Sequence, residues 1–176
     1  PEVDASDGGF SIMSELRTNR IVPRDGLVSG AGKGGGIIQM VMTSSINSGS
    51  QFSTGSGTFV DVTGYNCTIT PQRSDSKILI TSNPMFLINN GSGSSQRVAL
   101  KLLRGSTSIF EREDFASYQV GNGQADYLGM ALYHQHLDSP ATTSAVTYKI
   151  QIRQHAGGGT TYVQAQSSMC LMEVSG

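Results

Sequence analysis

The segment that most constrains the fold of this chain is residues 146–153, in which apolar and polar side chains alternate strictly. Its apolar residues are Val146, Tyr148, Ile150 and Ile152. A period of two places these side chains on one face of an extended chain and the polar ones on the other. A turn precedes the segment at Ser139 and Pro140, because proline fixes φ and biases its predecessor towards extended geometry. The pattern predicts a half-buried β-strand of a sandwich or barrel.

Comparable segments recur from residue 37 onwards and predict an all-β protein. The expected strands lie within residues 37–43, 58–62, 67–70, 77–90, 97–103, 125–137, 143–154 and 160–174. We expect Gly64 to separate the second strand from the third and Pro84 to interrupt the fourth. Only 14% of the residues are charged and 22 are glycine, and no helix-period segment of useful length appears. About eight strands with long connections are typical of a two-sheet jelly roll.

The ordered set of these segments resembles a recurrent β-sandwich module of bacteriophage fibre proteins. Residues 137–151 read Leu-Asp-Ser-Pro-Ala-Thr-Thr-Ser-Ala-Val-Thr-Tyr-Lys-Ile-Gln, and residues 58–64 read Thr-Phe-Val-Asp-Val-Thr-Gly. The latter are followed by Thr-Ile-Thr-Pro at 68–71 and Ser-Lys-Ile-Leu-Ile at 76–80. Shorter matches lie at residues 36–41, 102–106 and 170–176. The resemblance therefore covers residues 36–176 in the expected order.

This resemblance implies a trimeric jelly roll of the tumour-necrosis-factor and complement C1q type. The sequence gives independent support, because residues 77–90 and 125–137 carry apolar side chains on both faces. A strand that is apolar on both faces must be covered twice, once by its own sandwich and once by something else. We expect the second cover to be a neighbouring copy of the same chain.

The N-terminal part differs in composition from the strand-rich part. We expect residues 13–36 to form an extended arm with a Gly-rich linker, followed by the jelly-roll domain at residues 37–176. Residues 1–12, which begin with Pro1, are expected to be upstream sequence or a remnant of expression. The arm carries the candidate attachment residues Arg17, Arg20, Arg24 and Lys33. A formal net charge of −1 argues against nucleic-acid binding, and no apolar run is long enough to insert in a membrane.

Two sets of side chains raise the question of metal or redox chemistry. His134 and His136 would point to the same face of a strand, and a trimer would gather six imidazoles near its axis. Ordinary surface or interface histidines are the simpler interpretation, so we expect no metal and no cofactor. Cys67 and Cys170 are expected to be buried free thiols, in agreement with assembly in the reducing cytoplasm of a host.

Residues 89–96 and 113–126 are expected to be the long loops, where a β scaffold often carries recognition. The candidate receptor contacts there are Phe115, Tyr118, Asn122, Tyr127, Asn89 and Asn90. The alternative is that these aromatic residues pack under their own loop or between subunits. We expect Asp114, Asp126 and Asp138 to cap or solubilise loops and turns, and Glu111, Glu113 and Asp114 to form a solvated loop.

No grouping of nucleophile, base and orienting residue is visible, so we expect no enzymatic activity. The sequence favours a non-enzymatic virion structural protein, a trimeric fibre or knob module that attaches by its arm and contacts a host surface glycan or protein. One alternative is a capsid-decorating or tail-attached protein without a receptor role, which would contact only other virion proteins. The second alternative is a polysaccharide-processing enzyme on a β-sandwich, with a carboxylate pair that is placed by folding.

Overall fold

The structure is a computed structural model that describes residues 36–43, 51–89, 95–119 and 127–176. The chain divides into two units, Pro1–Gly32 and Lys33–Gly176, and all of the described residues belong to the second. Of the expected arm and linker at residues 13–36, residues 13–35 therefore lie outside the described residues. Among the described residues, no helix is long and apolar enough to span a membrane.

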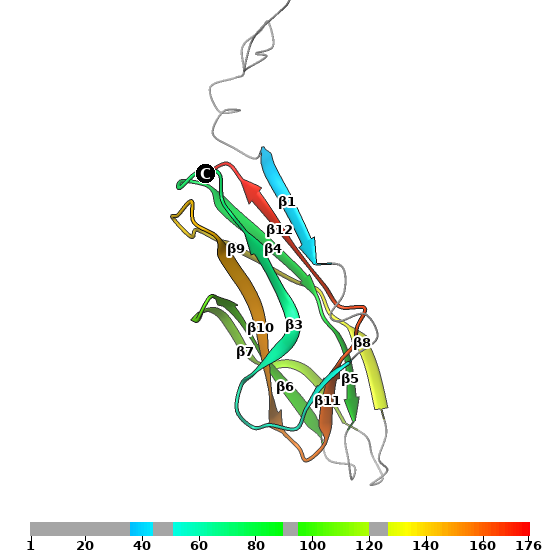
Figure 1. Ribbon diagram of the computed structural model, residues 1–176. Coiled ribbons are helices and arrows are strands. Elements are labelled where there is room, and N and C mark those ends of the chain that lie inside the picture. Colours follow the sequence, from blue (N-terminus) through cyan, green and yellow to red (C-terminus); the bar gives the residue numbers. More distant parts are fainter. Residues whose placement is uncertain (1–35, 44–50, 90–94, 120–126) are drawn as a thin grey trace, which may run out of the picture. The chain divides into compact units, whose positions relative to one another are not determined.

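The described part of the chain is built from antiparallel strands (Figure 1). Their bounds are β1 Ile37–Thr43, β2 Phe52–Thr54, β3 Val60–Ile69, β4 Lys77–Asn83, β5 Met85–Asn89, β6 Gln96–Arg104, β7 Thr107–Tyr118, β8 Tyr127–Ala131, β9 His134–Asp138, β10 Val146–Ala156, β11 Thr160–Val163 and β12 Ser168–Val174. They form three sheets with the orders β1-β12-β4-β9, β2-β11-β5-β8 and β3-β10-β6-β7.

The first two sheets are formed by the same segments of chain and make up one bent layer of the sandwich. β4 continues into β5 across Pro84, β8 into β9 across residues 132–133, and β11 into β12 across residues 164–167. At the bend, the Leu132 amide donates to the Pro84 carbonyl at 3.0 Å and the Gln164 amide donates to the Met85 carbonyl at 2.8 Å. Hydrogen bonds of this kind tie the segments together where the ladders are interrupted.

Four pairs of strands, β1 and β2, β4 and β5, β8 and β9, and β11 and β12, each count as one long segment. With β3, β6, β7 and β10 this gives eight segments, which we number 1 to 8 in chain order. One layer then has the order 1-8-3-6 and the other the order 2-7-4-5. These two orders are those of a jelly roll, in which the chain passes repeatedly between two facing sheets. The prediction of an all-β jelly roll of about eight strands is confirmed.

The core lies between the bent layer and the β3-β10-β6-β7 sheet. In β10 the side chains of Val146, Tyr148, Ile150 and Ile152 are all buried, as their alternation predicts. They pack with buried residues of the facing layer, such as Ile80 and Leu171. Full burial of a side chain of this size contributes about 1.5–3 kcal/mol, so this contact between layers is the main source of stability.

Two tyrosine hydroxyls join the layers where an apolar contact cannot. The Tyr65 hydroxyl donates to the Ser168 carbonyl at 2.8 Å, and the Tyr148 hydroxyl donates to the Asp138 carboxylate at 2.8 Å. Burial raises the pKa of the Tyr148 hydroxyl, and the Asp138 carboxylate raises it further. Burial also raises the pKa of the Tyr65 hydroxyl, so both hydroxyls remain protonated donors.

Several predicted boundaries are wrong for identifiable reasons. Gly64 does not end a strand, because it takes a φ of 81° inside β3 and forms a bulge opposite β10. Glycine adopts this left-handed backbone at little cost, so the ladder resumes beyond it. The predicted loop at residues 113–126 is also wrong at its start, because β7 runs on to Tyr118.

Gly157 gives a prediction about the turn between β10 and β11. Its φ is 94°, and a Cβ at this position would lie 2.6 Å from the Ser95 carbonyl oxygen. We expect Gly157→Ala to lower the free energy of unfolding by about 1–3 kcal/mol, because both the strained backbone and the contact disfavour a side chain. Gly158→Ala is the matched control, since a Cβ there meets nothing within 4 Å. Urea denaturation measures both, and equal effects of the two substitutions would contradict the prediction.

Candidate functional site

The two outer faces of the sandwich differ in chemistry. In the bent layer, the outward-facing residues are odd-numbered in β4, β5, β8 and β9 and even-numbered in β11 and β12. The same alternation therefore continues across the bend, and the outer face of the layer is continuous. Among the outward side chains of the described strands in this layer, Lys77 is the only charged one. We call this surface the apolar face.

An apolar row crosses the four strands of the β1-β12-β4-β9 sheet. Met40 pairs with Met172, Met172 with Leu79, and Leu79 with Leu137. The two ends of the row are exposed, with 63% of Met40 and 52% of Leu137 accessible to solvent. The adjacent row contains Met42, which is 59% exposed, beside Cys170. Large apolar side chains in register on an exposed sheet face indicate a surface that another molecule covers.

The apolar face extends over the second half of the bent layer. Met85 and Leu87 face outward from β5, and Tyr162 pairs with Leu87. The rings of Tyr127 and Tyr162 lie 6.4 Å apart at their centroids. Tyr127 is 53% exposed, and it therefore belongs to this face rather than to an isolated loop.

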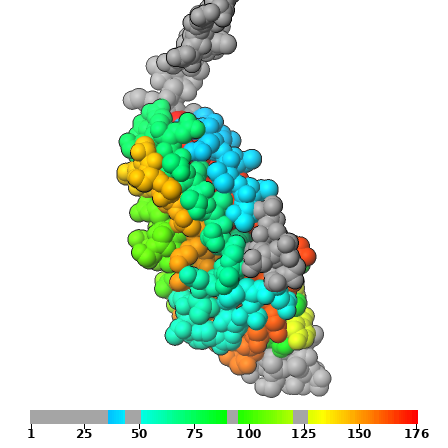
Figure 2. Space-filling view, in the orientation of Figure 1, coloured from blue at the N-terminus to red at the C-terminus, as the bar shows by residue number. Residues whose placement is uncertain are grey.

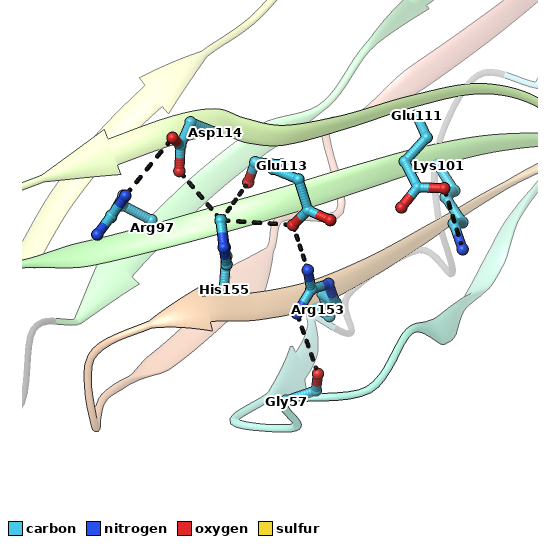
Figure 3. A network of polar contacts seen from close by, with 8 residues as sticks. All are labelled: Gly57, Arg97, Lys101, Glu111, Glu113, Asp114, Arg153 and His155. Carbon is cyan, nitrogen blue, oxygen red and sulfur yellow. Dashed lines mark hydrogen bonds and ion pairs between the residues drawn. The ribbon is translucent and has the colours of Figure 1, made fainter.

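The outer face of the β3-β10-β6-β7 sheet is covered instead by paired charges, and we call it the charged face (Figure 3). Lys101 lies 3.2 Å from Glu111, Lys149 lies 2.8 Å from Asp61, and Arg153 contacts Glu113. Exposed pairs of this kind contribute about 0–1 kcal/mol each. Their main effect is to make this face compatible with water.

Two bulges create a tighter polar cluster on the charged face (Figure 3). Register shifts occur in the β6–β7 ladder between Val98 and Leu100 and in the β10–β6 ladder between Gln154 and Ala156. The first leaves Glu113 and Asp114 both exposed although they are consecutive in β7. His155 Nδ1 lies 3.2 Å from Asp114 and 3.4 Å from Glu113.

A polar hollow lies at the end of the β6–β7 ladder, next to this cluster. Its volume is about 310 Å³, and its lining residues are Ser95, Arg97, Ser117, Tyr118 and Gln119. Arg97 and Ser117 are cross-strand partners and both are exposed. Arg97 also lies 3.6 Å from Asp114, so the hollow and the cluster share one guanidinium. Sequence reasoning found Tyr118 but missed Arg97, whose importance depends on the β6–β7 register.

The histidine pair lies inside the sandwich rather than on its surface. His134 and His136 share one face, as expected, and their rings are 6.4 Å apart. His134 is buried, however, and its ring lies 4.1 Å from that of Phe110. Burial lowers the pKa of His134, and the neighbouring His136 lowers it further, so neutral His134 is an aromatic packing residue. Within the described part of the chain, no group of three or more His, Cys, Asp or Glu side chains could hold a metal ion.

The predicted receptor contacts do not come together at one place. Phe115 lies in β7 and packs on the core, with its ring 6.2 Å from Phe86. Tyr118 lines the hollow, whereas Tyr127 belongs to the apolar face and Asn89 ends β5. The predicted contacts and attachment residues that lie outside the described residues are Asn90, Asn122, Arg17, Arg20, Arg24 and Lys33.

Four of the carboxylates named from the sequence and both cysteines lie among the described residues, whereas Asp126 lies outside them. Asp138 does not solubilise a turn, because it is buried and accepts hydrogen bonds from Arg104 at 3.0 Å and from Tyr148. Glu111, Glu113 and Asp114 lie in strand β7 rather than in a loop. Cys67 and Cys170 are free, the first buried and the second half-buried.

Comparisons with known proteins find likenesses only among solved structures. No protein-family model matches the chain, and no curated protein matches its sequence. The chain is similar to the VP2 subviral particle of infectious bursal disease virus, with a TM-score of 0.38, 13% identity, and coverage of 76% of this chain and 32% of that one. It is also similar to an insecticidal delta-endotoxin of Bacillus thuringiensis, with a TM-score of 0.37, 14% identity, and coverage of 72% of this chain and 20% of that one. A third similar structure is latent PorU of Porphyromonas gingivalis, with a TM-score of 0.37, 10% identity, and coverage of 82% of this chain and 14% of that one.

The chain thus spans about a third or less of the length of these proteins. At these TM-scores the likenesses carry no argument about function. The strand order alone identifies the jelly roll.

The apolar face depends on the position of β1, which a buried glutamate fixes. The Glu173 carboxylate accepts hydrogen bonds from the Gln39 side chain at 2.6 Å and from the Gln72 and Arg73 amides at 2.9 and 3.2 Å. Gln39 and Thr43 also donate to carbonyls of Thr70 and Asn66, so β1 lies beside β3 at an edge of the sandwich (Figure 2). Burial alone would raise the pKa of Glu173, but these hydrogen bonds lower it below its ordinary value.

We expect Glu173→Gln to lower the free energy of unfolding by about 1.5–3 kcal/mol at neutral pH, because the hydrogen bonds lose their charged acceptor. A carboxyl whose pKa is lower in the folded chain stabilises the fold above its unfolded pKa, near 4.5, and loses this effect as the pH falls through the folded value. The difference in the free energy of unfolding between the wild type and Glu173→Gln should therefore shrink below that pH. Denaturation at several pH values measures it.

The matched control for this prediction is Asp75→Asn, which removes an exposed carboxylate bonded to Arg73. Because this pair is exposed, its loss should change stability much less. If Glu173→Gln lowers the free energy of unfolding by the same amount at neutral and at acidic pH, the charge of the Glu173 carboxylate does not have the stabilising role given to it here.

Proposed function

We propose that this protein is a non-enzymatic structural module of a phage virion, a trimeric fibre or knob that contacts the surface of a host cell. The observation that carries the proposal is the apolar face, which crosses the whole bent layer and holds one charged side chain among the described strands. The resemblance of residues 36–176 to phage fibre modules supports the virion context and the number of copies.

A second copy of the chain is the cover that fits this face best. Over both halves of the layer the described strands present one charged side chain, Lys77 at the start of β4, so copies can meet there while burying little unpaired charge. It is also rich in methionine, tyrosine and leucine, and Met and Tyr are enriched in the centres of protein interfaces. The charged face on the opposite side of the sandwich would remain in water, as its ion pairs require.

The alternative within the same fold is a virion-decorating protein that associates only with other virion proteins. In that case the trimer would make no contact with the surface of a host cell. Binding of the trimer to whole bacterial cells separates the two roles, since only an attachment module requires it.

The enzyme alternative has a separate test. The carboxylates of Glu113 and Asp114 lie on the charged face. If the protein were a glycosidase, these two carboxylates would be the candidate catalytic pair. Turnover of a surface polysaccharide that is lost in Glu113→Gln or Asp114→Asn would establish an enzyme and overturn the proposal.

We expect Leu137→Lys to convert a trimer into monomers without unfolding the chain. Leu137 is half-exposed at the edge strand β9, so a lysine there is tolerated in the monomer, whereas each buried unpaired charge in the interface costs about 3–5 kcal/mol. Native mass spectrometry measures the oligomer. Ser108→Lys, exposed on β7 in the other sheet, is the matched control and should remain trimeric. A wild-type monomer would refute the trimer directly.

The two cysteines provide a second readout of the same interface. Cys170 faces outward beside Met42, and Cys67 is buried in the core. Burial raises the pKa of the Cys170 thiol, so labelling by a maleimide will be slow even where the thiol is accessible. We expect protection of Cys170 in the wild type, labelling of Cys170 in Leu137→Lys, and labelling of Cys67 only on unfolding. Equal labelling of Cys170 in wild type and variant would contradict coverage of this face.

A further inference from the structure

We propose that the polar hollow at the end of the β6–β7 ladder is a binding subsite for a neutral, hydroxyl-rich sugar unit. This inference rests on the host contact proposed above, and it names the chemical class that the contact would recognise. The apolar face plays no part in it.

The size of the hollow suits a small ligand. Its volume is about 310 Å³, which lies at the lower limit of ordinary ligand sites and accommodates roughly one or two sugar rings. The five lining residues lie at one end of the antiparallel β6–β7 ladder, where β6 begins and β7 ends and where Arg97 pairs with Ser117. The buried residues of β6, among them Val98 and Leu100, hold this end of the ladder in place.

The lining offers the groups that bind hydroxyls. Arg97 supplies N–H donors, Gln119 an amide that both donates and accepts, and Ser95 and Ser117 hydroxyls that do the same. Tyr118 adds an aromatic ring, which gives an apolar surface for the C–H groups of a sugar. A purely hydrophobic ligand would leave these polar groups without water or partner.

The electrostatics select a neutral ligand. Arg97 lies 3.6 Å from Asp114, and Arg153 contacts Glu113 close by, so two guanidinium groups are matched by two carboxylates (Figure 3). A phosphate or uronate would approach both carboxylates and would have to compete for a guanidinium that is already paired. The Arg97–Asp114 separation exceeds hydrogen-bonding distance, however, so the guanidinium retains donors that neutral hydroxyls can use.

The backbone around the hollow is irregular in a way that suits a site. Both register shifts described above fall next to Arg97, one in the β6–β7 ladder and one where β10 pairs with β6. Bulges re-aim side chains and are over-represented next to functional sites. Here they bring Glu113, Asp114 and His155 to the outer surface beside the same arginine.

The test is a titration of the ¹⁵N-labelled protein with methyl glycosides of glucose, galactose and mannose, and with glucuronic acid, followed by NMR. We expect shifts confined to the amides near Arg97 and Ser117 with at least one neutral glycoside. Arg97→Gln should weaken that binding by about tenfold or more, since a hydrogen bond to a charged group is lost. Arg73→Gln is the matched control, because Arg73 is exposed and bonded to Asp75 outside the hollow, and it should bind as the wild type does.

Each other outcome overturns the assignment. No shift with any of the four sugars would reject a saccharide subsite, and a response to glucuronic acid alone would reject a neutral ligand. Unchanged binding by Arg97→Gln would place the ligand elsewhere. A trimer that binds cells equally well with and without Arg97 would remove this subsite but leave the proposed function intact, whereas a wild type that binds no cells would remove the host contact itself.

Discussion

The contact between the two layers of the sandwich is the interaction on which the rest of the structure depends. Strict alternation in β10 turns Tyr148, Ile150 and Ile152 towards the bent layer, where they are almost fully buried. Because side chains alternate along a strand, those of both layers that do not point into this contact point to an outer face. The difference between the two outer faces is therefore a direct consequence of how the core is built.

The same constraint explains why one face is apolar. The strands of the bent layer have apolar residues at both odd and even positions, as in β4, where Ile78 and Ile80 face the core while Leu79 faces outward. Since β10 and its neighbours can cover only the inner face, the outer apolar residues have no cover within the described chain. In β10, by contrast, the outward positions are Thr147, Lys149, Gln151 and Arg153, which water solvates without a partner chain.

Sequence reasoning succeeded where periodicity determines the structure and failed where register does. The period of two in residues 146–153 was enough to predict the buried face of β10 and, with the other strands, the jelly roll. It could not predict that Gly64 bulges within β3, or that Asp138 meets Arg104 and Tyr148 across the layers. These contacts join residues distant in sequence. His134 was misplaced for the same reason, because the ring that covers it belongs to Phe110, on a strand of the other layer.

The two proposed surfaces are compatible because they lie on opposite sides of the core. Arg97 and Ser117 face outward from the β3-β10-β6-β7 sheet, whereas Met40, Leu79 and Leu137 face outward from the bent layer. Copies that cover the apolar face therefore leave the hollow open to solvent. A trimer would then present three such hollows, and weak individual sugar contacts would add through multivalency. A module of this kind needs no deep pocket in one chain to hold a cell surface, since rigid repetition of a shallow site supplies the affinity.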